Sequence, residues 1–77
     1  NPFNPSTTIQ YALHSRTHAA LLVYNILGQR VAELVNEEKD AGSYEIQFDA
    51  SGLASGVYLY RLEAGSFVQT RKLVVLK

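Results

Sequence analysis

The side chains best suited to chemistry are two histidines, and they lack the surroundings of a metal or catalytic site. His14 and His18 are four residues apart, a spacing that brings two imidazoles together on a helix. Here the pattern predicts a connection between strands over residues 14–18, where the same spacing leaves the rings apart. We therefore interpret both histidines as solvated loop residues.

Two groups of carboxylates are equally incomplete as cation sites. The stretch Asp49-Ala50-Ser51-Gly52 lacks the further spaced carboxylates and the closing glutamate of a calcium loop. A turn held by the Asp or Ser side chain explains it better. The run Glu37-Glu38-Lys39-Asp40 mixes both signs of charge and is typical of a solvated loop.

The remaining catalytic patterns are missing from the sequence. No serine stands in a Gly-x-Ser-x-Gly setting, and no glycine-rich phosphate loop separates a strand from a helix. The chain contains no cysteine, which excludes disulfides and thiolate metal sites. The sequence predicts a protein that is not an enzyme and uses no metal or cofactor.

The five tyrosines could form a stacking platform for carbohydrate. However, four of them fall on predicted core faces, and tryptophan is absent. These four are Tyr11, Tyr44, Tyr58 and Tyr60. A carbohydrate-binding, cell-attachment or spacer module is the alternative hypothesis for function.

The composition indicates one small globular domain over residues 1–77, and the two Asn-Pro steps predict an extended junction over residues 1–6. The chain has 77 residues, 47% of them hydrophobic, and seven basic and seven acidic residues give a net charge of zero. Such a balance argues against nucleic-acid binding, and no apolar run reaches the length of a membrane span. Because methionine is absent, we expect the chain to be part of a longer protein.

Short apolar runs separated by turn residues predict an all-β sandwich of six or seven antiparallel strands. A helix over residues 19–27 is the alternative for one segment. Loops are expected at residues 14–18, 37–40 and 49–56. The predicted strands cover residues 9–13, 19–24, 30–36, 44–48, 57–62 and 67–76.

Two hairpin turns are predicted from their glycines. A three-residue loop at Glu63-Ala64-Gly65 places Gly65 in the left-handed conformation and sets Leu62 opposite Ser66, Tyr60 opposite Val68 and Tyr58 opposite Thr70. With this pairing, the core face takes Tyr58, Tyr60, Leu62, Val68, Val74 and Leu76, and Arg71 faces solvent. A two-residue loop would instead bring Gln69 and Arg71 onto the core face.

The same turn chemistry is expected at Ile26-Leu27-Gly28. It pairs Val23 with Val31 and leaves two apolar residues at the tip of the loop. We expect Leu27 to fold back over an open end of the sandwich; a contact with a partner is the alternative.

Four segments together resemble the C-terminal sorting domains of proteins exported by type IX secretion. They are NPFNPSTTI, VYNILGQRV, AGSYEIQFDASGLASGVYLYRLEAG and TRKLVVLK. The resemblance extends from Asn1 to Lys77. It implies a Greek-key, immunoglobulin-like sandwich of about seven strands that follows a larger passenger.

The resemblance also implies a function, partners and site residues. The domain would direct its passenger across the outer membrane for release or surface attachment, through a translocon and a sortase-like protease. Free edge strands would in addition allow a weak homodimer. The residues that match family motifs or carry the cationic end are Asn1, Pro2, Asn4, Pro5, Gly56, Tyr58, Arg71, Lys72 and Lys77.

Overall fold

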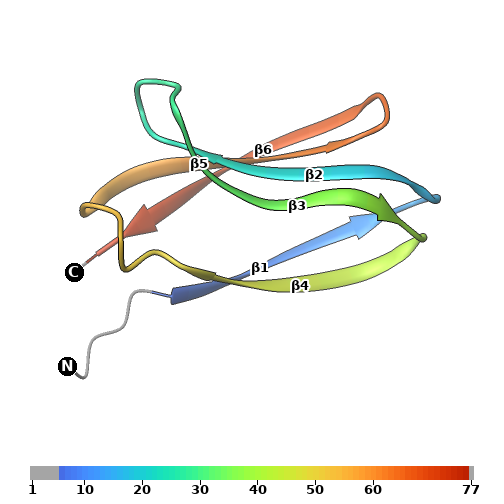
Figure 1. Ribbon diagram of the computed structural model, residues 1–77, viewed down its shortest axis with the longest axis horizontal. Coiled ribbons are helices and arrows are strands. Elements are labelled where there is room, and N and C mark those ends of the chain that lie inside the picture. The colour runs from blue at the N-terminus through green and yellow to red at the C-terminus, as the bar shows by residue number, and fades with distance from the viewer. Residues whose placement is uncertain (1–5, 77) are drawn as a thin grey trace.

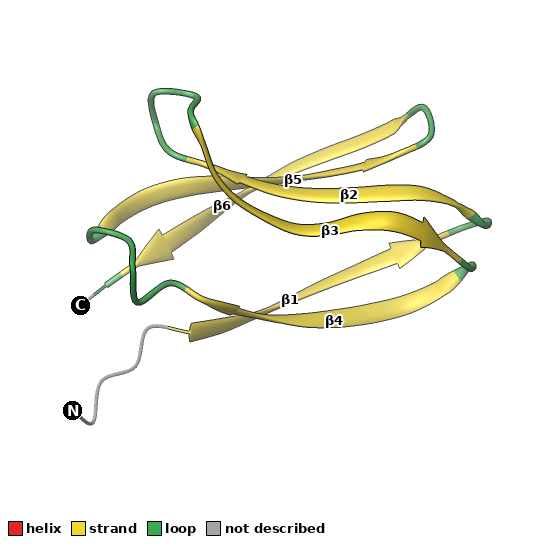
Figure 2. Cartoon of the chain, viewed as in Figure 1, coloured by secondary structure: helices red, strands yellow, loops and turns green. Residues whose placement is uncertain are grey.

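The computed structural model describes residues 6–76, and these form six antiparallel strands in two sheets, without a helix (Figures 1 and 2). The predictions for Asn1, Pro2, Asn4, Pro5 and Lys77 lie outside the described residues. The all-β prediction is confirmed, and the alternative of a helix over residues 19–27 is wrong. The strands are β1 (Ser6–Leu13), β2 (Thr17–Tyr24), β3 (Arg30–Lys39), β4 (Gly42–Asp49), β5 (Gly56–Ala64) and β6 (Phe67–Val75).

The sheets differ in size. One contains β1 and β4, and the other has the order β3-β2-β5-β6. Figure 1 shows the smaller sheet lying across one face of the larger. Within the described residues, β3 and β6 are therefore the two edges of the larger sheet.

The core lies between the sheets because successive side chains of a strand point to opposite faces, and the faces that the two sheets turn toward each other carry the buried apolar residues. Ala19, Leu21 and Val23 of β2 are fully covered, since β2 has a neighbouring strand on both sides. From the smaller sheet, Ile9, Tyr11 and Leu13 of β1 and Phe48 of β4 pack against them. The core is completed by Val35, Ala50, Tyr58, Leu62 and Val75.

The charged run at residues 37–40 is mostly strand rather than the predicted loop. β3 continues to Lys39, which lies opposite Thr17 of β2. The Lys39 ammonium lies 3.1 Å from Glu37 and 4.9 Å from the centre of the Tyr44 ring. Ion pairing and the aromatic contact let charged residues form a strand here. His18 likewise belongs to β2 and not to the loop.

The turn between β2 and β3 has the predicted three-residue loop. Gly28 has a φ of 82°, and the backbone N–H of Asn25 donates to the carbonyl of Gln29 at 3.0 Å. Tyr24 lies opposite Arg30, as this loop requires, but a bulge then sets Val23 opposite Ala32. The predicted pair of Val23 with Val31 is therefore wrong.

The tip of this turn does not cover the sandwich. Leu27 is 78% exposed and Ile26 is 76% exposed. The Asn25 side chain instead organises the turn, because its oxygen accepts hydrogen bonds from the N–H groups of Leu27 and Gln29, both at 2.9 Å. The expectation that Leu27 folds back is wrong.

The turn between β5 and β6 has the predicted positive φ at Gly65, 62°, but a different loop. Ala64 lies opposite Phe67, so only Gly65 and Ser66 form the connection. A glycine with positive φ at the first of two loop positions is the pattern of a type II′ turn. Leu62 consequently lies opposite Gln69 rather than Ser66.

The shorter loop reverses the predicted faces of β6. Leu73 and Val75 point toward the core, and Val75 is only 3% exposed. Val68, Val74 and Leu76, predicted as core, are more than half exposed. The predicted pairs of Tyr60 with Val68 and Tyr58 with Thr70 are also wrong.

Candidate recognition surface

The histidines and carboxylates of residues 6–76 form no metal centre. No group of three or more histidines and carboxylates of this part of the chain could hold an ion. His18 contacts the Asn36 side chain at 2.6 Å. The N–H of Ser51 donates to the carboxylate of Asp49 at 2.9 Å, which confirms the predicted side-chain turn.

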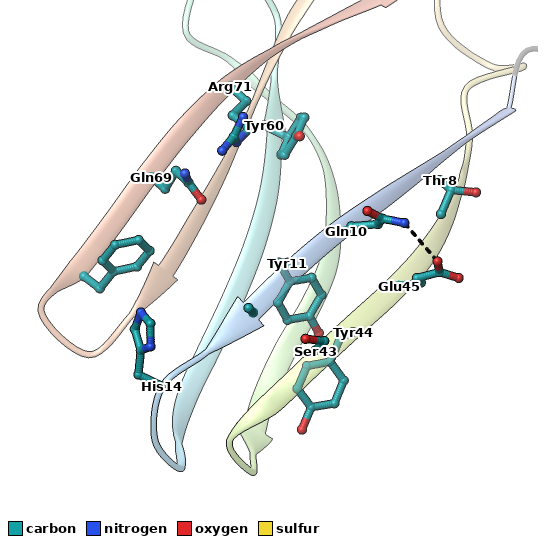
Figure 3. Close-up of a pocket in the computed structure, with 12 residues that line it drawn as sticks. Thr8, Gln10, Tyr11, His14, Ser43, Tyr44, Glu45, Tyr60, Gln69 and Arg71 are labelled. Atoms are coloured by element: carbon teal, nitrogen blue, oxygen red, sulfur yellow. Dashed lines mark hydrogen bonds between the residues drawn. The ribbon is translucent and has the colours of Figure 1, made fainter.

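An open groove of about 990 Å³ lies on the side of the sandwich where β1 and β6 end the two sheets (Figure 3). Tyr60, Gln69 and Arg71 line it from the larger sheet, and Tyr11 and Tyr44 from the smaller. The groove exists because two strands cannot cover the inner face of four. The inner face of β6 is covered at Val75 but open at Arg71.

The tyrosines of the groove do not form an exposed platform. The Tyr11 and Tyr44 rings stack on each other, with centres 5.3 Å apart, and Tyr44 donates its hydroxyl to the carbonyl of Asp40 at 2.6 Å. Tyr11 is 9% exposed, and burial raises the pKa of its phenol. These rings belong to the packing between the sheets.

The predicted Gly-x-Tyr residues hold the start of β5. Gly56 has a φ of 154°, which disfavours residues with a Cβ. Tyr58 is 7% exposed, which confirms its predicted burial, and it donates its hydroxyl to the carbonyl of Ala54 at 2.7 Å. Because Gly56 lies opposite Val75 and Tyr58 opposite Leu73, these residues support the end of β6.

Arg71 and Lys72 occupy opposite faces of β6. Arg71 lies opposite Tyr60, so it points to the groove and not to the outer face as predicted, yet it remains exposed. Lys72 lies opposite Leu59 on the outer face. The predicted orientation of Arg71 failed with the predicted loop, because one residue of register exchanges the two faces.

Among the cations of residues 6–76, only these two make no ion pair. The others lie close to carboxylates: Arg16 contacts Asp40, Arg30 lies 3.6 Å from Glu33, Lys39 lies 3.1 Å from Glu37, and Arg61 lies 2.9 Å from Glu63 without the angle of a hydrogen bond. Hydrogen bonding to Glu37 raises the pKa of Lys39, and the contact with Asp40 raises that of Arg16. The described unpaired positive charge is thus confined to β6.

Sequence reasoning missed an apolar surface around Lys72. Val57, Leu59 and Val74 are 42%, 39% and 52% exposed and lie on the same outer face, because Val57 faces Val74 across the two strands. Apolar residues on both faces of β5 and β6 were visible in the sequence. The outer face of this pair of strands is therefore partly apolar in the described residues.

One comparison with known proteins identifies the chain. A family described as secretion system C-terminal sorting domain matches residues 1–76. Searches of curated proteins and of solved structures gave no significant match. No helix of the described residues could cross a membrane.

Proposed function

The chain belongs to the secretion system C-terminal sorting domain family, and from this premise we propose that β6 presents the sorting signal to the secretion machinery. Domains of this family are the non-catalytic sorting signals of type IX secretion. Proteins that carry them are secreted or attached to the cell surface by way of the outer membrane. The proposal concerns which residues of this chain carry the signal.

The observation that carries the proposal is the charge on β6. Arg71 and Lys72 are the cations of residues 6–76 without an ion pair, and both are exposed. Exposed cations without partners affect recognition more than folding. Lys77 would add to the same charge.

The other motif residues have supporting roles in this proposal. Gly56 and Tyr58 fix β5, to which β6 is paired. Asn1, Pro2, Asn4 and Pro5 would form the junction with the passenger, because a residue before proline favours extended backbone.

The proposal includes a finer fold and two partners. The order β3-β2-β5-β6 facing β1-β4 supports an immunoglobulin-like, Greek-key sandwich. The outer-membrane translocon would read the surface of β6. A sortase-like protease would then act at the junction with the passenger.

A carbohydrate-binding or cell-attachment module is the second candidate, and the groove of Figure 3 is what favours it. Tyr60, Gln69 and Arg71 combine a ring, an amide and a cation there. Such groups can bind a sugar, but the Tyr11 and Tyr44 rings are stacked together. The sorting function therefore has the stronger support.

The test is export of a foreign passenger. A folded reporter is fused ahead of Asn1 and expressed in a bacterium that has type IX secretion, with the reporter alone as control. We expect the fusion outside the outer membrane and the reporter alone inside the cell. A folded fusion that stays in the periplasm would contradict sorting and favour the binding module.

A further inference from the structure

The free edge of β6 is regular enough to pair with another strand. β6 is hydrogen-bonded to β5 alone, and its nine residues follow β5 without a register shift. Natural proteins usually block such an edge with a bulge, a proline, a covering segment or charged side chains. Of these, only the charges of Arg71 and Lys72 lie on β6 in the described part of the chain, and such cations repel another basic strand but attract an acidic one.

The turn geometry identifies the backbone groups that point outward. Ala64 and Phe67 close the two-residue turn, and the residues that close a turn exchange a hydrogen bond. In an antiparallel ladder every second pair is bonded. The N–H and C=O groups of Val68, Thr70, Lys72 and Val74 therefore face away from β5.

The side chains of β6 indicate what kind of strand would fit. The strand reads FVQTRKLVV and contains no acidic residue. Its two cations are neighbours, so they project to opposite faces of the sheet. An added strand with two adjacent carboxylates would place one beside each cation, because cross-strand neighbours share a face.

We propose that β6 accepts an extended strand from a protein partner, and that this strand carries acidic side chains at two adjacent positions facing Arg71 and Lys72. The inference rests on the proposed function, in which that partner belongs to the secretion machinery. Main-chain hydrogen bonds would provide binding and the carboxylates would provide selectivity. A second copy of β6 fits poorly, because it would bring only further cations to the interface.

A proline separates edge pairing from folding. Thr70→Pro removes an outward N–H and leaves the bonds to β5, since proline is tolerated on an edge strand when its nitrogen faces solvent. Thr70→Val keeps that N–H and is the matched control. Thermal unfolding and the dispersion of NMR chemical shifts would check that both variants are folded.

In the export assay, Thr70→Val should behave as wild type. Folded Thr70→Pro should lose export by about tenfold or more, the change that follows from about 1.4 kcal/mol of lost binding. Equal export of the two folded variants would overturn the inference while leaving sorting intact. Failure of the wild-type fusion itself would instead refute the proposed function.

The charge of the added strand is tested with peptides on the isolated 77-residue chain. The acidic probe is Thr-Val-Thr-Val-Glu-Glu-Val-Thr-Val, and the basic probe has Lys-Lys in place of Glu-Glu. We expect the acidic peptide to shift and protect the β6 amides, and we expect Arg71→Glu with Lys72→Glu to reverse the preference. Arg30→Glu, on the opposite edge, should not change it.

Three results would contradict this part of the inference. They are equal effects of the two peptides, shifts centred on β3, and a wild-type dimer that Thr70→Pro abolishes. The last result would assign the edge to a second copy of the chain.

Discussion

The two edges of the larger sheet are built in opposite ways. β3 is interrupted by two register shifts against β2, and its cations Arg30 and Lys39 are paired with carboxylates of the same strand. β6 follows β5 without a shift and has unpaired cations. The same sheet therefore has one irregular edge with paired cations and one regular edge with unpaired cations.

Exposure alone does not distinguish the two edges. Both edges are exposed and charged, but on β3 the charges satisfy one another and the bulges disturb the ladder. On β6 the charge and the backbone are both free in the described residues. This difference between the two edges is the basis of our proposal that β6 pairs with a partner strand.

The largest expected effect is a loss of stability on removing Tyr58, and it tests whether the core holds β6, the regular edge of the larger sheet. Tyr58→Ala should lower the free energy of unfolding by roughly 3–5 kcal/mol, because a large buried ring is lost beneath the end of β6. Tyr58→Phe should cost only about 1 kcal/mol for the bond to Ala54. Denaturant unfolding measures both, and an unchanged midpoint for Tyr58→Ala would show that β6 is not held there.

The next effect compares the faces of β6 itself. Val75 is 3% exposed and Val74 is 52% exposed. Val75→Ala should therefore cost about 2 kcal/mol, and Val74→Ala less than about 0.5 kcal/mol. A larger cost for Val74→Ala than for Val75→Ala in denaturant unfolding would restore the three-residue loop and exchange the faces of the strand.

A smaller effect compares the turns that lead into the two edges. Gly65→Ala should cost about 1–2 kcal/mol, because left-handed backbone disfavours a Cβ and the new atom would lie 3.3 Å from the Thr17 hydroxyl. Gly28→Ala has the same backbone penalty and open space around it. Thermal unfolding should therefore rank Gly65→Ala as the less stable variant, and the opposite ranking would contradict the described β5–β6 turn.

The smallest expected effect is a pH dependence of stability through Tyr11, on the side of the sandwich where Lys39 of β3 lies over the Tyr44 ring. Burial raises the pKa of Tyr11 above 10.0, so its contribution to stability is complete below pH 10 and is lost as pH rises through the folded-state pKa. The free energy of unfolding should decline above pH 10, and Tyr11→Phe should reduce that decline. An identical pH profile for Tyr11→Phe would mean that the ring is solvated.

Local patterns predicted the strands well and their faces less well. Alternation and short apolar runs located the interior of the strands, and glycine chemistry located the left-handed turn residues Gly28 and Gly65. The face of β6 was wrong because apolar residues occur on both sides of it. The three-residue loop was preferred because a two-residue loop places Gln69 and Arg71 on the inner face of β6. The structure tolerates them there because the smaller sheet does not cover that part of the inner face.

Two other failures have the same origin, in contacts distant along the sequence. The run at residues 37–40 looked like a loop because its partners, Thr17 of β2 and the Tyr44 ring, cannot be inferred locally. The unpaired state of Arg71 and Lys72 likewise depends on where every carboxylate lies. In the sequence, Arg71 and Lys72 stood out only because the segment TRKLVVLK resembles the terminal motif of the family.

The most direct test of the account is the ratio of exported to total passenger for two charge-reversed fusions. One carries Arg71→Glu with Lys72→Glu on β6, and the other carries Arg30→Glu on β3. Both should fold, because exposed charge changes usually alter stability by less than about 0.5 kcal/mol per site. The account predicts that the β6 reversal lowers this ratio severalfold and that the β3 reversal leaves it at the wild-type value. An unchanged ratio for the folded β6 reversal, or an equal loss for both, would contradict it.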